Sequence, residues 1–325
     1  MPLNIETYLP SLEQLPSTYA ISLSHYNAIS LAGDEQSKYL QGQVTCDVNS
    51  STAHSLLIGA HCNAKGKVFS AFRLINRGNA HLLIQPKATL DISIRELKKF
   101  GVFAKVEITR TDNLSFYALV GAEATQILQN NFSRIPDSLN PVVQSGSTSL
   151  VYIAGNQNRY LLIDEAAILE PIMTQIKLPV FPNSVWNLLE INDGFVQLAS
   201  EASGEYVPQM LNLQAINGIS FTKGCYLGQE TVARMQYLGK NKRALYSLKF
   251  KTNTPFSSDD AIEKQLGDNW RKAGEVLSCY QSEDGTSYVQ AILGSDVENT
   301  TSLRLKSQPD VVVTIQPLPY SLVSE

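Results

Sequence analysis

One cysteine stands in a setting typical of reactive thiols. The segment 221–234 has the sequence FTKGCYLGQETVAR, which places Cys225 two residues after Lys223. The pattern GQETVARMQYLG at 228–239 predicts a helix, so Cys225 lies just ahead of a helix N-terminus. Unpaired backbone N–H groups and a nearby cation both favour a thiolate, with a pKa below the usual ~8.5. We therefore expect a functional thiol at Cys225, with Lys223 as its cation or as a contact for an anion.

The glycines of this loop support two interpretations. Gly224 and Gly228 let the backbone approach a ligand closely or adopt positive φ. The same Gly-Cys-Tyr sequence is also compatible with a tight turn whose cysteine packs inward. The residues alone leave both possibilities open.

The other cysteines, Cys46, Cys62 and Cys279, predict neither a metal site nor a disulfide scaffold. No two cysteines form a C-x-x-C pair, and no histidine lies at zinc-finger spacing from another ligand. Four cysteines among 325 residues are too few for a disulfide framework. Cys279 lies within an expected strand, and we expect it to fill a core.

Composition excludes several classes of protein. Apolar content of 43% and charge of 17% are typical of an ordinary globular protein, and no run reaches the ~18 apolar residues of a membrane span. The first basic residue is Lys38, so the start resembles neither a secretory signal nor a mitochondrial transit peptide, and we expect a cytoplasmic protein. A net charge of −4 argues against strong direct binding of nucleic acid.

An internal repeat organises the first part of the chain. Segments 28–41 (AISLAGDEQSKYLQ) and 117–129 (YALVGAEATQILQ) each join an apolar strand to Gly-x-Glu and then Leu-Gln. Each copy continues into hairpin strands and closes with a helical pattern, at 88–100 and 165–177. Gly-x-Glu alone is common at strand-to-helix turns, but the shared order of elements favours duplication. That order predicts a ferredoxin-like unit in each copy.

The pattern of apolar and polar residues changes after Ala244. About five short alternating strands separated by turn-rich stretches predict a small antiparallel barrel. The fold class is therefore α+β, with two ferredoxin-like units and a C-terminal antiparallel β-barrel. We expect the units at 1–110, 111–240 (with the cysteine loop) and 241–325, with possible interleaving of the first two.

The cysteine segment resembles the signature of a known family. The string KGCYLGQE, from Lys223 through Tyr226 to Glu230, is similar to that of the YgfZ family of folate-binding, tRNA-modifying proteins. Three further stretches carry the resemblance: YLQGQVTCDV at 39–48, HCNAKGKV at 61–68 and YVPQMLNLQAINGISF at 206–221. The family is related to the glycine-cleavage T-protein, an aminomethyltransferase. The resemblance implies a three-domain cloverleaf around a central folate crevice, with the sulfur of Cys225 facing into it.

The resemblance also implies which residues contact tetrahydrofolate or a related folate. Tyr26 and Trp186 occupy the positions of the family's folate-contacting aromatics, although without the resemblance each would be expected to be a core aromatic. Asn192 in INDG stands where the pterin-binding carboxylate is expected, and we expect Asp193 to point elsewhere. Ser70 and Ala71 replace the paired aspartates of T-proteins. Because neither can ionise, acid-base catalysis by that mechanism is lost, and a conventional enzyme is not expected.

By resemblance, the first hypothesis is an accessory factor. It would bind folate, support iron–sulfur proteins including the radical enzymes that methylthiolate tRNA, and use Cys225 for redox, sulfur or one-carbon handling. Gln229 and Glu230 would hold the loop. The alternatives are a folate-dependent one-carbon transferase or demethylase with another acid-base group, such as Asp47 or Glu230, and a purely structural module that binds partners.

Overall fold

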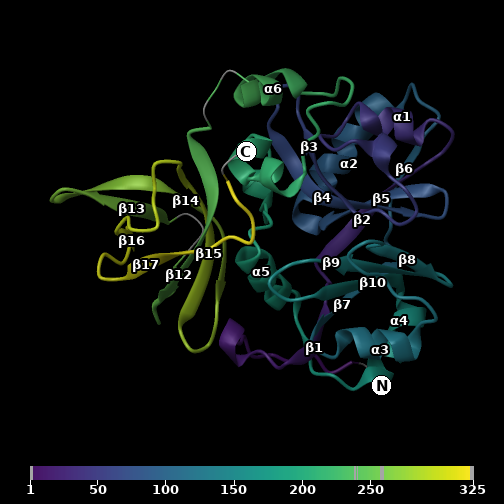
Figure 1. The fold of residues 1–325 in the computed structure, drawn as a ribbon, viewed down its shortest axis with the longest axis horizontal. Coiled ribbons are helices and arrows are strands. Elements are labelled where there is room, and N and C mark those ends of the chain that lie inside the picture. Colours follow the sequence, from purple (N-terminus) through teal and green to yellow (C-terminus); the bar gives the residue numbers. More distant parts are fainter. Residues whose placement is uncertain (1–2, 238, 240, 257–259, 323–325) are drawn as a thin grey trace.

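Two sheets and a barrel surround a central helix (Figure 1). The computed structural model describes residues 3–237, 239, 241–256 and 260–322. No helix in these ranges is long and apolar enough to cross a membrane. The α+β class with a C-terminal barrel is confirmed.

The first sheet is antiparallel and has five strands in the order β3-β4-β5-β2-β6. Its strands are β2 (Tyr26–Ala32), β3 (Leu57–Cys62), β4 (Val68–Arg77), β5 (Ala80–Pro86) and β6 (Glu107–Arg110). Its helices are α1 (Gln36–Gln41) and α2 (Lys87–Gly101). Strands β6, β2, β5 and β4 follow the ferredoxin-like order, and β3 extends the sheet.

The second sheet repeats this plan but takes a strand from the start of the chain. Its order is β11-β1-β7-β10-β9-β8. The strands are β1 (Thr18–Ser22), β7 (Leu114–Gly121), β8 (Val142–Ser145), β9 (Thr148–Ile153), β10 (Arg159–Glu165) and β11 (Val180–Phe181). Strand β1 lies beside β7 as β6 lies beside β2, so the sheets interleave in sequence. The borders at 110/111 and 240/241 stay predictions.

The equivalent glycines of the repeat perform the same task in both sheets. Gly33 and Gly121 have φ of 127° and 109°, a region that side chains disfavour. A Cβ at Gly33 would lie 2.4 Å from the carbonyl oxygen of Lys105, and one at Gly121 would lie 2.0 Å from that of Ser17. Each glycine thus lets a neighbouring chain segment cross the strand-to-helix turn.

The two sheets face each other across one apolar core, and helices cover their outer faces. Residues of β1, β2, β5, β7 and β10 share that core with Trp186 of α5. Helices α1 and α2 cover the first sheet, and α3 and α4 cover the second. The remaining α-helices are α3 (Ala124–Asn131), α4 (Ala166–Ile176), α5 (Asn183–Asn192) and α6 (Gln229–Tyr237). Short 3₁₀ turns occupy Leu12–Gln14, Val48–Ser50, Ser200–Ala202, Pro208–Leu211 and Leu213–Ile216.

The barrel closes with six strands, where the sequence indicated about five. They are β12 (Arg243–Lys251), β13 (Ala261–Leu266), β14 (Asn269–Gln281), β15 (Thr286–Gly294), β16 (Leu303–Leu305) and β17 (Val312–Gln316). Cys279 lies on β14 and is exposed, so its expected place in a core is wrong. Alternation along the strand puts its neighbour Tyr280 inside instead.

Candidate functional site

The loop that carries Cys225 is fixed by a buried lysine. The ammonium of Lys223 donates to the backbone oxygens of Gln41, Val44 and Cys46 at 2.7, 2.8 and 2.7 Å. It also lies 5.1 Å from the centre of the Tyr226 ring. Burial lowers the pKa of Lys223 to about 8, whereas the three acceptors favour its protonated form. All three N–H groups are used, so Lys223 anchors the loop and its expected role as a contact for an anion is not met.

Two glycines from distant motifs lock the other end of the loop. Gly228 has φ of 84°, and a Cβ there would lie 2.4 Å from the carbonyl oxygen of Asn63. Gly66 has φ of 72°, and its Cβ would lie 2.8 Å from the carbonyl oxygen of Gly228. The backbone N–H of Leu227 donates a hydrogen bond to the backbone oxygen of Gly42 at 3.0 Å. The loop therefore contacts the segments 39–48 and 61–68 that share the family resemblance.

Cys225 points outward from this rigid support. Its thiol is exposed, so the alternative of an inward-packed cysteine is wrong. It lines a pocket of about 240 Å³ with Gly42, Gln43, Phe100, Tyr226 and Leu227. By contrast, burial raises the pKa of Cys46 to about 12 and also raises that of Cys62. Accessible thiols in the described part of the chain are thus Cys225 and Cys279.

The helix predicted after the cysteine is present, and its start lies within one residue of the predicted segment 228–239. Helix α6 begins at Gln229, four residues beyond Cys225, and the N–H of Gln229 donates to the backbone oxygen of Tyr226 at 3.1 Å. Glu230 forms an exposed ion pair with Arg234 at 3.7 Å. Gln229 therefore helps to close the loop, whereas Glu230 faces solvent.

A second site lies at the centre of the molecule. A cavity of about 550 Å³ is lined from the first sheet by Arg73, from the second by Tyr152 and Arg159, and from the end of α5 by Asp193. Tyr320, beyond the barrel, also lines it and donates to the backbone oxygen of Gly194 at 2.7 Å. Its lining and that of the Cys225 pocket share no residue. The expectation that Cys225 faces the central hollow is therefore wrong.

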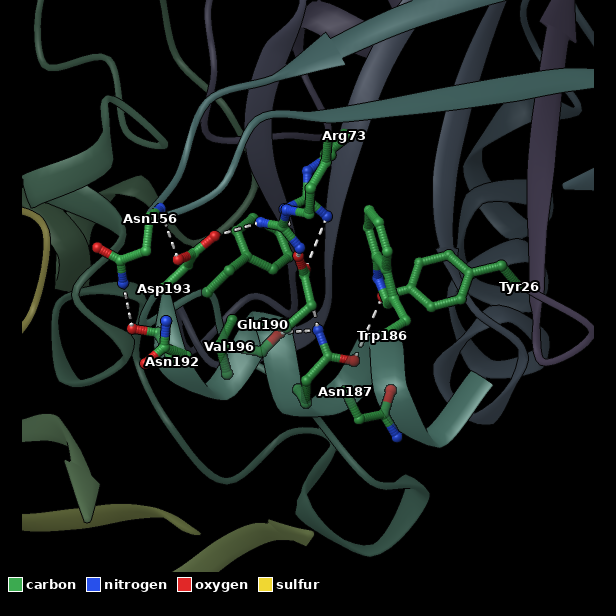
Figure 2. Close-up of polar contacts among 12 residues, drawn as sticks. Tyr26, Arg73, Asn156, Trp186, Asn187, Glu190, Asn192, Asp193 and Val196 are labelled. Carbon is green, nitrogen blue, oxygen red and sulfur yellow. Dashed lines mark hydrogen bonds and ion pairs between the residues drawn. The ribbon is translucent and has the colours of Figure 1, made fainter. Parts of the chain in front are cut away.

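A buried ionic network forms the floor of this cavity (Figure 2). Glu190, fully buried, accepts both Nη groups of Arg73 at 2.8 and 3.0 Å and one from Arg159 at 2.6 Å. The other Nη of Arg159 donates to Asp193 at 2.6 Å. Two guanidinium groups thus balance two carboxylates.

The network sets the charge states of its members and leaves one donor free. Burial acts to lower the pKa of Arg73, but Glu190 outweighs it and raises that pKa overall. Burial raises the pKa of Asp193, against the opposing effect of Arg159. The Nε of Arg159 is buried without a hydrogen-bond partner in the described part of the chain. The carboxylate of Asp193 lines the cavity and suits a ligand that donates hydrogen bonds.

Tyr26 and Trp186 lie behind this network. Trp186 Nε1 donates to the hydroxyl of Tyr26 at 3.1 Å, and that hydroxyl donates to Gln197 at 3.3 Å. Both rings are buried, and the guanidinium of Arg159 lies 4.6 Å from the centre of the Trp186 ring. Neither ring lines the central cavity, whereas Tyr26 lines a separate cavity of about 420 Å³ beside Asn183. They support the floor of the central cavity from below.

The carboxylate at the cavity comes from Asp193 and not from the position expected. Trp186 and Glu190 project from α5 toward Arg73 (Figure 2), and Asp193, directly after the helix, pairs with Arg159. The three residues follow one another at helical spacings of four and three. Asn192 lies outside this face of the helix, and its backbone oxygen accepts a hydrogen bond from Nδ2 of Asn156 at 3.2 Å. The expectation that Asp193 points elsewhere is therefore wrong. The spacing of Trp, Glu and Asp in WNLLEIND, four and then three residues, indicated that Asp193 shares a helix face with Trp186 and Glu190, and the resemblance led us to Asn192 instead.

Ser70 and Ala71, which the resemblance places at the aspartate positions of T-proteins, are buried. Ser70 Oγ has no hydrogen-bond partner among the described residues, and Ala71 packs with Val196 and Leu198. No group of three or more His, Cys, Asp or Glu residues suited to a metal ion occurs in the described ranges.

The two loop glycines provide a matched pair of variants. Gly228→Ala should lower the free energy of unfolding by about 1–3 kcal/mol, because its positive φ and the approach of Asn63 both resist a side chain. Gly224→Ala should be nearly neutral, because nothing lies within 4 Å of a Cβ there. Urea unfolding of both variants tests this. Equal stability of the two would contradict the locked loop.

Removing the central charge should expose the dependence of the fold on the network. Glu190→Gln leaves the two arginines underpaired in a buried setting, and we expect a loss of roughly 3–5 kcal/mol in the free energy of unfolding. Glu275→Gln, which breaks an exposed pair with Lys272, should cost at most about 1 kcal/mol. Thermal and urea unfolding provide the comparison, and equal losses would refute the assigned role.

Comparisons with known proteins agree with this architecture. Residues 241–308 match the family model described as YgfZ, beta-barrel domain. The glycine cleavage system aminomethyltransferase T from Bartonella henselae superposes with a TM-score of 0.68 at 13% identity, over 94% of this chain and 86% of that one. That similarity establishes the fold alone.

Sequence relatives extend over the whole chain. The tRNA-modifying protein YgfZ of Colwellia psychrerythraea is 62% identical over 100% of both chains. The protein of the same name from Yersinia enterocolitica is 40% identical over 96% of this chain and 95% of its own. The expected family is thereby confirmed. The chain belongs to the YgfZ family.

Proposed function

We propose that this chain is a cytoplasmic, folate-binding accessory protein of tRNA modification that supports iron–sulfur enzymes through Cys225. Its full-length relatives are named tRNA-modifying proteins, and its fold is that of an aminomethyltransferase T-protein. The observation that carries the proposal is the exposed thiol of Cys225 on a loop fixed by Lys223 and Gly228. The fixed backbone of this loop holds the accessible sulfur of Cys225 in one position, which suits repeated binding of partner proteins.

The central cavity has the chemistry that a folate requires. Its volume of about 550 Å³ lies in the range of small-molecule sites. Asp193, which lines the cavity, offers a carboxylate to the N–H groups of an amino-pyrimidine edge. Phe195, Tyr152 and Tyr320 supply aromatic walls for a flat ring. These residues fit a tetrahydrofolate or a related folate, which would supply one-carbon chemistry when bound.

The protein's own contribution is to hold and orient the ring. The Arg73–Glu190–Arg159 network fixes Asp193 before a ligand arrives, so little side-chain ordering remains to oppose binding. The separate linings of the cavity and the Cys225 pocket favour two tasks performed at two places.

The alternative of a one-carbon transferase gains no support from the candidate acid-base groups. Asp47 accepts hydrogen bonds from Gln41 at 2.8 Å and from the N–H of Asn49 at 3.2 Å, which ties it to a local turn. Glu230 is exposed, and neither carboxylate lines the central cavity. Formaldehyde release from candidate amines in the presence of tetrahydrofolate would revive this alternative.

A titration with tetrahydrofolate tests the cavity. We expect micromolar binding by the wild type, at least tenfold weaker binding by Asp193→Ala, and near-unchanged binding by Asn192→Ala, because Asp193 alone of the two lines the cavity. Isothermal calorimetry gives the affinities, and circular dichroism checks that both variants fold. Tyr26→Ala and Trp186→Ala should weaken binding only through loss of support beneath the network. Absence of wild-type binding at high micromolar ligand would end the folate proposal.

A deletion strain tests the thiol. Wild type and Cys279→Ser should restore tRNA methylthiolation, and Cys225→Ala should not, because both thiols are exposed but only Cys225 lies in the anchored loop. Mass spectrometry of tRNA nucleosides measures the modification, and immunoblotting confirms equal protein levels. Full restoration by Cys225→Ala would favour a purely structural module.

A further inference from the structure

Three large apolar side chains stand in solvent directly after α2. The exposed fractions are 49% for Phe100, 72% for Val102 and 94% for Phe103. We call these three residues the 100–103 surface. Contiguous exposed apolar groups of this size are uncommon on a folded protein and mark sites of interaction.

The backbone beneath the 100–103 surface is anchored on both sides. Gly101 is buried against Ile108, and the N–H of Ala104 donates to its backbone oxygen at 3.1 Å. Glu35 and Lys105 form two hydrogen bonds with each other. The backbone N–H of Lys105 donates to the Glu35 carboxylate at 2.9 Å, and the backbone N–H of Glu35 donates to the Lys105 backbone oxygen at 3.2 Å. The apolar side chains are therefore presented by a fixed turn, which reduces the entropy lost when a partner binds.

The 100–103 surface is continuous with the pocket that holds the exposed thiol of Cys225. Phe100 forms one wall of the pocket of about 240 Å³ that Cys225 and Gln43 also line. A segment bound across Phe100 would reach the thiol of Cys225.

The charges around the surface indicate the chemistry of its occupant. Segment 95–107 holds four basic and two acidic residues, a local net charge of +2 in a chain of net charge −4. Lys98 and Lys105 are exposed on either side of the three apolar residues. Like charges would oppose each other if two copies of this chain met here, whereas an acidic partner would be attracted.

We infer that the 100–103 surface docks a partner protein through a segment that combines apolar and acidic side chains, and so delivers that partner to Cys225. The role of Cys225 toward the docked partner rests on the proposed function, but the docking itself can be measured independently. It gives the thiol a means of selecting its clients, which an exposed sulfur alone lacks.

A photo-crosslinker placed in the surface identifies the occupant. Phe103→p-benzoylphenylalanine is expressed in cells and irradiated, and the attached peptide is sequenced. A synthetic copy of that peptide is then titrated against wild type, Val102→Asp and Val312→Asp. Val312 lies on the barrel strand β17 with 73% exposure against 72% for Val102, so the two substitutions are matched.

We expect the attached peptide to be acidic and apolar and to come from another protein. Its affinity should fall at least tenfold in Val102→Asp and stay unchanged in Val312→Asp. Crosslinks to this chain itself, to RNA, to lipid or to nothing overturn the inference, as does equal weakening by both variants. If Val102→Asp alone loses the peptide while Cys225→Ala keeps full tRNA modification, the docking surface stands and the proposed role of the thiol fails.

Discussion

The buried ionic network on α5 is the interaction on which the arrangement of the molecule depends. Arg73 belongs to the first sheet and Arg159 to the second. Glu190 belongs to the helix between the sheets and the barrel, and Asp193 directly follows that helix. Charges this deep are tolerated only when fully paired, so the two sheets and the helix must come together in one geometry. The network therefore fixes the relative placement of three elements and, with it, the shape of the central cavity.

A different physical principle holds the cysteine loop. Lys223 fills the gap between three backbone oxygens, and Gly66 and Gly228 allow two chains to touch where any side chain would separate them. One end of the loop thus depends on charge and the other on the absence of a Cβ. The two sites are built independently, which agrees with their separate linings and with the proposed separation of ligand binding from thiol exposure.

Local sequence signals predicted much of the fold, and long-range contacts limited the rest. The alternating strands of the barrel and the repeated order of elements depend on local pattern, so they were visible in the sequence. The glycines at 33 and 121 were visible as part of the repeat, but the distant segments that approach them, at Lys105 and Ser17, were not. The contacts of Lys223 could not be predicted, because its three acceptors lie about 180 residues earlier in the chain. Asn192 was chosen by resemblance, whereas helical periodicity from Trp186 and Glu190 favours Asp193, and the structure follows the periodicity.

The exchange of β1 into the second sheet has a consequence for how the protein is made. Residues Thr18–Ser22 leave the ribosome early, yet their partner β7 ends at Gly121 and β11 lies later still. At the usual pace of translation, the first strand waits roughly 5–20 seconds for its neighbour. During that interval the apolar strand β1 has no partner strand. Nascent chains of this architecture are therefore expected to need chaperones until the second sheet emerges.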